Sequence, residues 1–211
     1  MTDRTITAAD AAYCLDQVRR FDRDRYLAAL FAAPQARADL MALYAFNLEV
    51  AKTREMVREP MMGLIRLQWW RDSLAEIYAG IERRHQVVQP LAAAIRRHGL
   101  DRAPFDRLIE AREGDMAETP PADLPALVGY VDATAGGLGL LAAQTLGGAD
   151  ERAALAVRAV WIAWALAGLL RAVPFHARHR RVHLPQGLLA QHGLDVQDVL
   201  EQRRPPALAE V

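Results

Sequence analysis

The sequence has little of what disulfide-bonded, nucleic-acid-binding or membrane-spanning proteins need. Its one cysteine, Cys14, cannot form an internal disulfide and fits a reducing compartment. Basic and acidic residues number 26 each, so no net charge attracts nucleic acid. The first residues lack the apolar core of a secretion signal, and the longest apolar run, 159–170, is shorter than the roughly 20 residues of a membrane span. We therefore expect a cytoplasmic protein with no nucleic-acid partner.

The alternating pattern of strands is also missing, whereas apolar residues recur at helical spacing along the chain. The pattern predicts a single all-α domain over residues 1–211. A capping box at Thr7–Asp10 opens the first helix, and the charged stretch 21–25 breaks the chain after it. Further helices are expected at 26–33 (stopped by Pro34), 36–59 (with one buried face, ended by Pro60), 62–78, 90–97, 104–117, 124–146 and 150–170. In the helix at 124–146, Gly136, Gly137 and Gly139 indicate a kink or a close helix approach.

The stretch from Trp161 to Pro185 combines an uncharged helix with a basic segment that contains several histidines. Ala165, Gly168 and Ala172 lie on one face of this helix, three and four residues apart. That face carries small side chains and no oxygen that could bind a metal. Small residues here predict either tight helix packing or a groove for an acyl or prenyl chain.

Five segments resemble, in the same order, the sequences of squalene and phytoene synthases, and the resemblance runs from about Tyr26 to Leu200. The segments are YLAALFAAPQARADLMALYAFN (26–47), RLQWWRDSL (66–74), LIEAREGDM (108–116), YVDATAGGLG (130–139) and RRVHLPQGLL (180–189). The resemblance implies the all-α isoprenoid-synthase fold, in which helices surround a long apolar cavity. Family members continue through further helices after the last segment, so the domain is either complete or truncated at its C-terminal end.

Members of this family join two prenyl diphosphates, which they hold through Mg²⁺ bound by two aspartate-rich motifs on facing helices. The chemistry needs this clamp because Mg²⁺ takes oxygen ligands and a departing diphosphate must have its charge neutralised. By the resemblance, the aspartates of the first motif fall here on Ala51, Lys52 and Glu55. One acid remains, and a cation has entered the motif.

The second motif has lost its acids completely. By the same resemblance its aspartates fall on Ala172 and His176, and the polar residues one and two turns earlier fall on Ala165 and Gly168. A neighbour could replace one lost carboxylate, but not nearly all of them on both helices. These replacements resemble one branch of the family, which includes the mitochondrial complex I assembly factor and its alphaproteobacterial relatives. That branch is thought to have kept the fold without the chemistry.

Three acids are the catalytic candidates if the chain is an enzyme, namely Glu55, Glu110 and Asp115. Glu110 and Asp115 match a third acidic segment of the family and could hold Mg²⁺ together with Glu55. The alternative is that all three are ordinary helix charges, with Glu55 pairing with Lys52 or Arg58. We expect no catalytic residue and no bound metal or cofactor unless the transferase alternative holds.

The basic segment carries the candidates for anion or lipid binding, which are His176, Arg178, Arg180 and Arg181. Arginines there could bind a phosphate, a lipid headgroup or an acidic partner surface, or could simply form a solvated loop. His176, His179 and His183 could in principle hold a transition metal, but Pro174 weakens the helical geometry that such a site needs.

The cavity-lining candidates come from the two helices that would carry the motifs. They are Tyr44, Asn47, Ala51, Ala165, Gly168 and Ala172. The tryptophans favour core positions over a ligand-binding box, most clearly Trp70, whereas Trp161 and Trp164 lie on the helix that would border the cavity.

The sequence thus favours a non-catalytic protein of the squalene/phytoene synthase type that assists assembly of respiratory complex I. It would act through complex subunits or membrane lipid headgroups, in the cytoplasm or peripherally on the inner face of the cytoplasmic membrane. The alternatives are a Mg²⁺-dependent prenyl-diphosphate transferase, and a carrier with a prenyl or acyl ligand.

Overall fold

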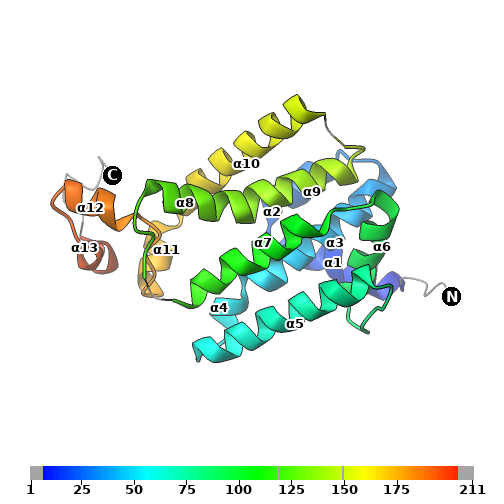
Figure 1. Cartoon of the computed structure of the whole chain (residues 1–211), viewed down its shortest axis with the longest axis horizontal. Helices are drawn as coiled ribbons and strands as arrows, with labels where there is room; N and C mark the ends of the chain where they lie inside the picture. Colours follow the sequence, from blue (N-terminus) through cyan, green and yellow to red (C-terminus); the bar gives the residue numbers. More distant parts are fainter. Residues whose placement is uncertain (1–6, 118, 149, 204–211) are drawn as a thin grey trace.

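The computed structural model describes residues 7–117, 119–148 and 150–203, and all regular structure in these ranges is helical (Figure 1). The all-α prediction is therefore confirmed. The elements are α1 (Ala8–Phe21), α2 (Arg23–Ala29), α3 (Pro34–Ala51), α4 (Thr53–Met56), α5 (Pro60–Tyr78), α6 (Val88–His98), α7 (Arg102–Glu113), η1 (Gly114–Met116), α8 (Leu124–Val131), η2 (Asp132–Gly136), α9 (Gly137–Thr145), α10 (Glu151–Arg171), α11 (Val173–Arg178), α12 (Gln186–Gln191) and α13 (Val196–Leu200).

Helix α3 forms the centre of the bundle. Every residue from Asp39 to Leu48 is buried, and α1, α6, α7 and α9 all contact this helix. We expected one buried face, but a helix that is apolar all round has to be enclosed by others. The aromatic core forms around Phe46, whose ring meets Trp70 and Phe105 edge to face, with ring centroids 5.2 and 5.4 Å apart. Trp70 is 1% exposed, as its predicted core position requires.

Side-chain caps set the first two helix starts. The hydroxyl of Thr7 accepts a hydrogen bond from the backbone N–H of Asp10, so the predicted start of α1 is confirmed. The helix does break in the charged stretch 21–25, but the break is limited to Asp22, which separates α1 from α2. The carboxylate of Asp22 accepts the backbone N–H of Arg25 and thereby starts the next helix.

The prolines open helices here. Pro34 stands in the first turn of α3 and Pro60 in the first turn of α5, where the missing backbone N–H leaves no hydrogen bond unmade. The prediction that Pro60 ends the helix of 36–59 is wrong, because α3 already ends at Ala51 and Lys52 leads into the short α4.

The glycine-rich stretch between α8 and α9 lets α10 approach closely. The chain continues from α8 through the π-helical turn η2 into α9, so the interruption predicted at the glycines is a π-helical turn inside one long helix. A Cβ atom added to Gly139 would lie 2.5 Å from Cγ of Trp161, on α10. The ring of Trp161 thus packs directly on the backbone of α9, which fits the predicted close approach.

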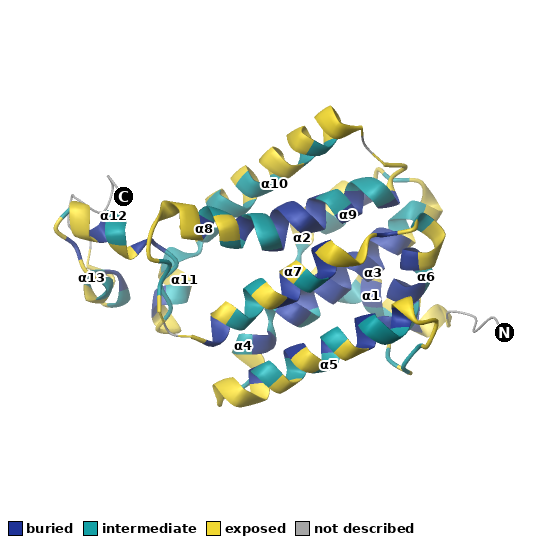
Figure 2. Ribbon diagram, viewed as in Figure 1, coloured by how far each residue is buried: buried dark blue, intermediate teal, exposed yellow. Residues whose placement is uncertain are grey.

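Helix α10 lies along the outside of the bundle, and none of its residues is buried (Figure 2). Two helical stretches of the described chain are long and apolar enough to cross a membrane by length and composition, Leu124–Thr145 and Glu151–Arg171. The first is 56% buried inside the protein, whereas the second is 0% buried. Burial in the core therefore explains the apolar composition of the first stretch only.

The helices that follow α10 form a small layer at one end of the molecule (Figure 1). They share a minor hydrophobic cluster built from Leu184, Leu189, Leu194 and Val199. Two backbone hydrogen bonds join this layer to the loop before α8, from Gln186 N–H to Pro121 O and from Gly187 N–H to Ala122 O, each 2.9 Å long.

The contact between Gly139 and Trp161 can be tested with a pair of glycine substitutions. Gly139→Ala should destabilise the protein by about 1–3 kcal/mol, because the new methyl group overlaps the indole ring. Gly129→Ala, in α8, meets no atom within 4 Å and should raise stability by about 0.5–1 kcal/mol through helix propensity. Urea unfolding of both variants measures the difference. Equal effects at the two positions would show that α9 and α10 do not approach as described.

Candidate functional site

A cavity of about 190 Å³ lies between α10 and the rest of the bundle. Its walls come from six elements, namely α2, α3, α7, α8, η2 and α10. The lining residues are Arg25, Asn47, Arg112, Tyr130, Val131, Thr134, Ala135, Trp164, Ala165, Gly168 and Leu169. A Cβ atom added to Gly168 would meet nothing within 4 Å, so this glycine leaves a groove and does not serve tight packing.

Three of the six cavity-lining candidates, Asn47, Ala165 and Gly168, lie on the wall of this cavity. Tyr44 is buried beside it, with its ring 6.2 Å from that of Trp161. The other two candidates are half-buried at helix ends, Ala51 at the end of α3 and Ala172 directly after α10.

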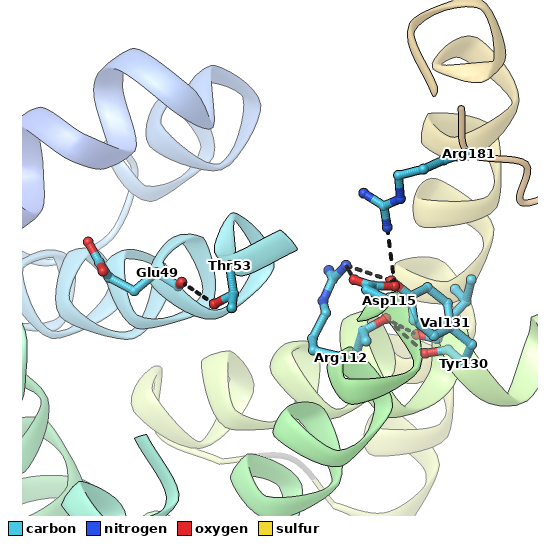
Figure 3. A network of polar contacts seen from close by, with 8 residues as sticks. Glu49, Thr53, Arg112, Asp115, Tyr130, Val131 and Arg181 are labelled. Carbon is cyan, nitrogen blue, oxygen red and sulfur yellow. Dashed lines mark hydrogen bonds and ion pairs between the residues drawn. The ribbon is translucent and has the colours of Figure 1, made fainter. Parts of the chain in front are cut away.

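The three candidate catalytic acids do not come together. Glu55 is exposed on α4, Glu110 is exposed on α7, and Asp115 is buried in η1. Within the described part of the chain, no group of three or more histidine, cysteine, aspartate or glutamate side chains could hold a metal ion. The first motif would stand where α3 ends and α4 begins. There the hydroxyl of Thr53 donates a hydrogen bond of 3.1 Å to the backbone carbonyl of Glu49 (Figure 3).

Asp115 is the acceptor at the centre of a polar network beside the cavity (Figure 3). One carboxylate oxygen accepts the hydroxyl of Tyr130 at 2.9 Å and lies 3.4 Å from Nη2 of Arg181. The other accepts Nη1 of Arg112 at 3.1 Å, and the same Nη1 donates to the Tyr130 hydroxyl at 2.6 Å. Two guanidinium groups thus share one carboxylate, which leaves this buried network with a net positive charge.

The pKa shifts agree with this arrangement. Burial raises the pKa of the Tyr130 hydroxyl, so it remains a neutral donor. Burial alone would lower the pKa of Arg112, but the neighbouring Tyr130, Asp115 and Glu55 raise it overall. Glu55 therefore contributes a distant negative charge to Arg112, and Asp115 is already engaged by two cations. Neither acid is placed like a metal ligand.

Cations have entered the region that the resemblance assigns to a metal clamp. The guanidinium group of Arg25 is enclosed by aromatic rings, 4.8 Å from the ring centroid of Trp161, 4.6 Å from that of Trp164 and 5.8 Å from that of Tyr44. It also pairs with Asp22 at 2.5 Å. These tryptophans therefore form a box, but one that is filled by a side chain of the protein itself.

The basic segment divides into an inward and an outward part. Arg181 points into the network, whereas Arg178 and Arg180 are exposed, and Arg180 adopts a left-handed backbone conformation with φ of 55°. The four anion-binding candidates are thus not one patch. His176 belongs to the inward part, because its ring lies 4.6 Å from that of His183.

The histidines do not form a three-membered metal site. His176 and His183 pack together, whereas His179 is exposed and its Nδ1 lies 2.9 Å from the backbone carbonyl oxygen of Phe175. Burial, together with the neighbouring positive charge of Arg181, lowers the pKa of both His176 and His183 to about 4. Both rings are therefore neutral at physiological pH.

Sequence reasoning missed three residues of this site. Arg112 and Tyr130 lie inside the quoted segments but carry no signal of their own, although Arg112 and Asp115 have the spacing of a helical ion pair. Arg25 lies in the charged stretch 21–25, and the sequence gives it no further signal. Its role depends on rings that are remote in the sequence, those of Trp161 and Trp164.

The arrangement of these helices is similar to that of solved isoprenoid synthases. A dehydrosqualene synthase crystallised with ligand superposes with a TM-score of 0.84 at 19% identity, over 95% of this chain and 70% of that chain. The squalene synthase HpnC from Alicyclobacillus acidocaldarius gives 0.83 at 22% identity, over 95% and 75%. The predicted isoprenoid-synthase fold is thereby confirmed.

The chain belongs to the squalene/phytoene synthase family, whose sequence model matches residues 18–211. Complex I assembly factor 6 of Bos taurus is 32% identical over 190 residues, 90% of this chain and 57% of the relative. The Homo sapiens protein of the same name is 30% identical over 91% and 58%, and chloroplastic phytoene synthase 3 of Zea mays is 28% identical over 90% and 46%. The chain thus spans less than two thirds of the length of these relatives.

Removing the charge of Asp115 tests the network. Asp115→Asn should destabilise the protein by about 3–5 kcal/mol, because Arg112 and Arg181 lose their shared carboxylate while buried. Asp106→Asn breaks only an exposed pair with Arg102 and should cost about 0.5 kcal/mol or less. Urea unfolding at neutral pH gives both values. An effect of Asp115→Asn as small as that of the control would mean that the network contributes nothing to stability.

The histidine pair makes stability depend on pH. As pH falls below the ordinary histidine pKa of 6.5, the unfolded chain takes up protons that folded His176 and His183 accept only near pH 4. The free energy of unfolding should therefore fall as pH is lowered from 6.5 to 4. His183→Gln should make this dependence on pH less steep. Urea unfolding at several pH values measures it, and NMR titration of the imidazoles reports the pKa values directly. A pKa near 6.5 for both rings would contradict their burial.

Proposed function

We propose that this chain is a non-catalytic member of its family that assists assembly of respiratory complex I. The observation that carries the proposal is the replacement of the metal clamp by cations and small side chains. Ala51, Lys52, Ala172 and His176 stand where the resemblance expects aspartates. The buried carboxylate beside the cavity, that of Asp115, is neutralised by two guanidinium groups.

The electrostatics oppose metal-dependent ionisation of a diphosphate. Mg²⁺ would need several free carboxylate oxygens, whereas the described cavity wall carries Arg25 and Arg112 and no carboxylate. Lys52 adds a positive charge and no ligand, and its ammonium group lies over the ring of Phe21. A transferase would have to use the exposed Glu55 and Glu110, although the described residues include no group of three or more candidate ligands. The enzyme alternative is therefore the weaker one.

The assembly role rests on the relatives named complex I assembly factor 6, which share about 30% identity with 90% of this chain. An assembly factor needs contact surfaces rather than reactive groups. The exposed Arg178 and Arg180 offer one to acidic protein surfaces or lipid headgroups. We place the protein in the cytoplasm or peripherally on the inner face of the cytoplasmic membrane.

The cavity itself favours a second candidate function, the carriage of an amphiphilic prenyl or acyl compound. Arg25, Asn47 and Arg112 form a polar part of its wall, and Ala135, Ala165 and Leu169 are among the residues of an apolar part. A prenyl or acyl compound with an anionic end group would match both the polar and the apolar part of the wall. Mass spectrometry of lipid that copurifies with the protein tests this candidate, and Gly168→Leu, which fills the groove, should abolish any such copurification.

The catalytic alternative predicts a clear signal in a Mg²⁺ titration with farnesyl diphosphate. We expect no metal-dependent heat of binding and no release of pyrophosphate, because too few carboxylates surround the cavity. Isothermal calorimetry and a pyrophosphate assay measure the two quantities. Release that disappears in Glu55→Gln would overturn the proposal and identify Glu55 as a metal ligand.

The assembly role makes a genetic prediction. Deletion of the gene should lower NADH dehydrogenase activity in membranes of the parent organism, and a Glu55→Gln/Glu110→Gln variant should restore it fully. Both carboxylates are exposed, so this variant removes candidate metal ligands without disturbing the core. Failure of the variant to restore activity, while wild type does, would favour a catalytic role.

A further inference from the structure

The cavity between α10 and the rest of the bundle contains polar groups that the fold leaves without hydrogen-bond partners. The polar residues of its wall are Arg25, Asn47, Arg112, Tyr130 and Thr134. Two of them are satisfied within the protein. The hydroxyl of Thr134 donates to the backbone carbonyl of Tyr130 at 2.8 Å, and the hydroxyl of Tyr130 donates to Asp115 at 2.9 Å. The other three residues each keep a polar group without a partner.

Asn47 is the clearest of these cases. It stands on the central helix α3 and is 6% exposed, and its side-chain amide makes no hydrogen bond to another described residue. A buried amide without a partner costs stability, so a partner is expected in the cavity that Asn47 lines. Helices of the described chain already enclose this residue. Any further surface against the outer side of α10 would only add to its burial.

Both arginines of the wall also have a nitrogen without an acceptor. Nε of Arg25 and Nε of Arg112 are buried and form no hydrogen bond within the described chain. Nη1 of Arg25 is used by Asp22. Nη1 of Arg112 is used by Asp115 and Tyr130 (Figure 3). Two guanidinium groups and one amide, from α2, α7 and α3, thus border the cavity with donors to spare, and an anion is the group that accepts from all three.

The charge beside the cavity determines which anion fits. Arg25 is balanced by its own carboxylate partner, whereas Arg112 and Arg181 share the single carboxylate of Asp115, which leaves one positive charge in excess. Glu55 also acts on Arg112, but it is exposed and solvent screens its charge. A carboxylate neutralises this excess with its one negative charge. A phosphate monoester carries about −1.5 to −2 at pH 7 and a diphosphate carries more, so either would leave buried negative charge without a balancing cation.

The size of the cavity limits the rest of the ligand. A protein cavity of about 150 Å³ holds one benzene molecule, so the cavity of about 190 Å³ accommodates roughly eight non-hydrogen atoms. Val131, Ala135, Ala165 and Leu169 give its wall an apolar part. This space matches a carboxylate with an apolar part of about five or six carbons. A prenyl diphosphate is too large for it.

We propose that the cavity is a metal-independent binding site for a short apolar monocarboxylate. The carboxylate accepts hydrogen bonds from Asn47, Arg25 and Arg112, and the apolar part of the ligand lies against α8, η2 and α10. This site would serve the second candidate function proposed above, on which the inference rests, and it narrows the ligand to one chemical class. The assembly role does not depend on it.

The experiment is an NMR titration of the ¹⁵N-labelled full chain with hexanoate, in EDTA to exclude metal. We expect saturable binding that shifts the side-chain amide signal of Asn47. Acetate should bind about a hundredfold more weakly, because each buried methylene strengthens binding by about fourfold. Hexyl phosphate should bind about tenfold more weakly than hexanoate, because its additional charge has no partner in the cavity.

Two substitutions on the same wall separate the unpaired amide from a satisfied hydroxyl. Asn47→Ala removes a donor that only the ligand uses, so it should weaken hexanoate binding by about tenfold or more. Thr134→Val is the matched control, because the hydroxyl of Thr134 already donates to backbone carbonyls and is not available to a ligand. It should leave the affinity within about twofold of wild type. Asn47→Ala should lower the unfolding temperature no more than Thr134→Val does, because it breaks no hydrogen bond of the ligand-free protein.

The proposal fails on any of four results. Equal binding of acetate and hexanoate would indicate an adventitious anion only. Tighter binding of hexyl phosphate than of hexanoate would assign the cavity to phosphate-headed compounds and would leave the carrier function standing. Unchanged hexanoate affinity in both Asn47→Ala and the cavity-filling Gly168→Leu would place the ligand elsewhere. If none of the three compounds binds, the site is refuted, and only copurifying lipid would then support the carrier function.

Discussion

The shared use of Asp115 by Arg112 and Arg181 is the interaction on which the arrangement of the C-terminal layer depends. Arg112 comes from α7 and Arg181 follows α11, and Tyr130 of α8 hydrogen-bonds to both Arg112 and Asp115. The hydroxyl of Tyr130 bonds to the carboxylate while its ring stacks on His183, with centroids 6.1 Å apart. The charge pairing therefore helps to fix the direction in which the chain leaves α11, and Arg181 and Arg112 add to the burial that lowers the pKa of His176 and His183.

The same charges define what the cavity can hold. In a site built for Mg²⁺, carboxylates face each other around the metal. Here Arg25 lies in a box of three aromatic rings and pairs with Asp22, and Lys52 lies over Phe21, so aromatic faces help to stabilise both cations. Restoring a single aspartate would leave these cations in place. A carboxylate clamp would therefore require several changes around the cavity.

Sequence reasoning could predict the all-α class and the family because both rest on local signals, helical spacing and ordered segments. It placed Trp70 in the core and the start of α1 correctly. It failed where one residue type can have either of two structural roles. Pro60 can end one helix or begin the next, and only the packing of α5 decides. Arg178, Arg180 and Arg181 look alike in sequence, but only Arg181 is within reach of Asp115, which lies far away in the chain.

The position of α10 connects the cavity with the outer surface. The helix is a single layer, about 10 Å thick, so its inner side lines the cavity while its outer face is exposed. Trp164 lies at the edge between these sides and borders the cavity together with Arg25 and, with Val160, a neighbouring apolar groove. Any surface that covers Trp164 therefore contacts a residue of the cavity wall. A partner on the exposed side of α10 and a ligand in the cavity would both contact Trp164. If one of them changed the affinity of the protein for the other, thermodynamic linkage would require the reverse effect to be equally large.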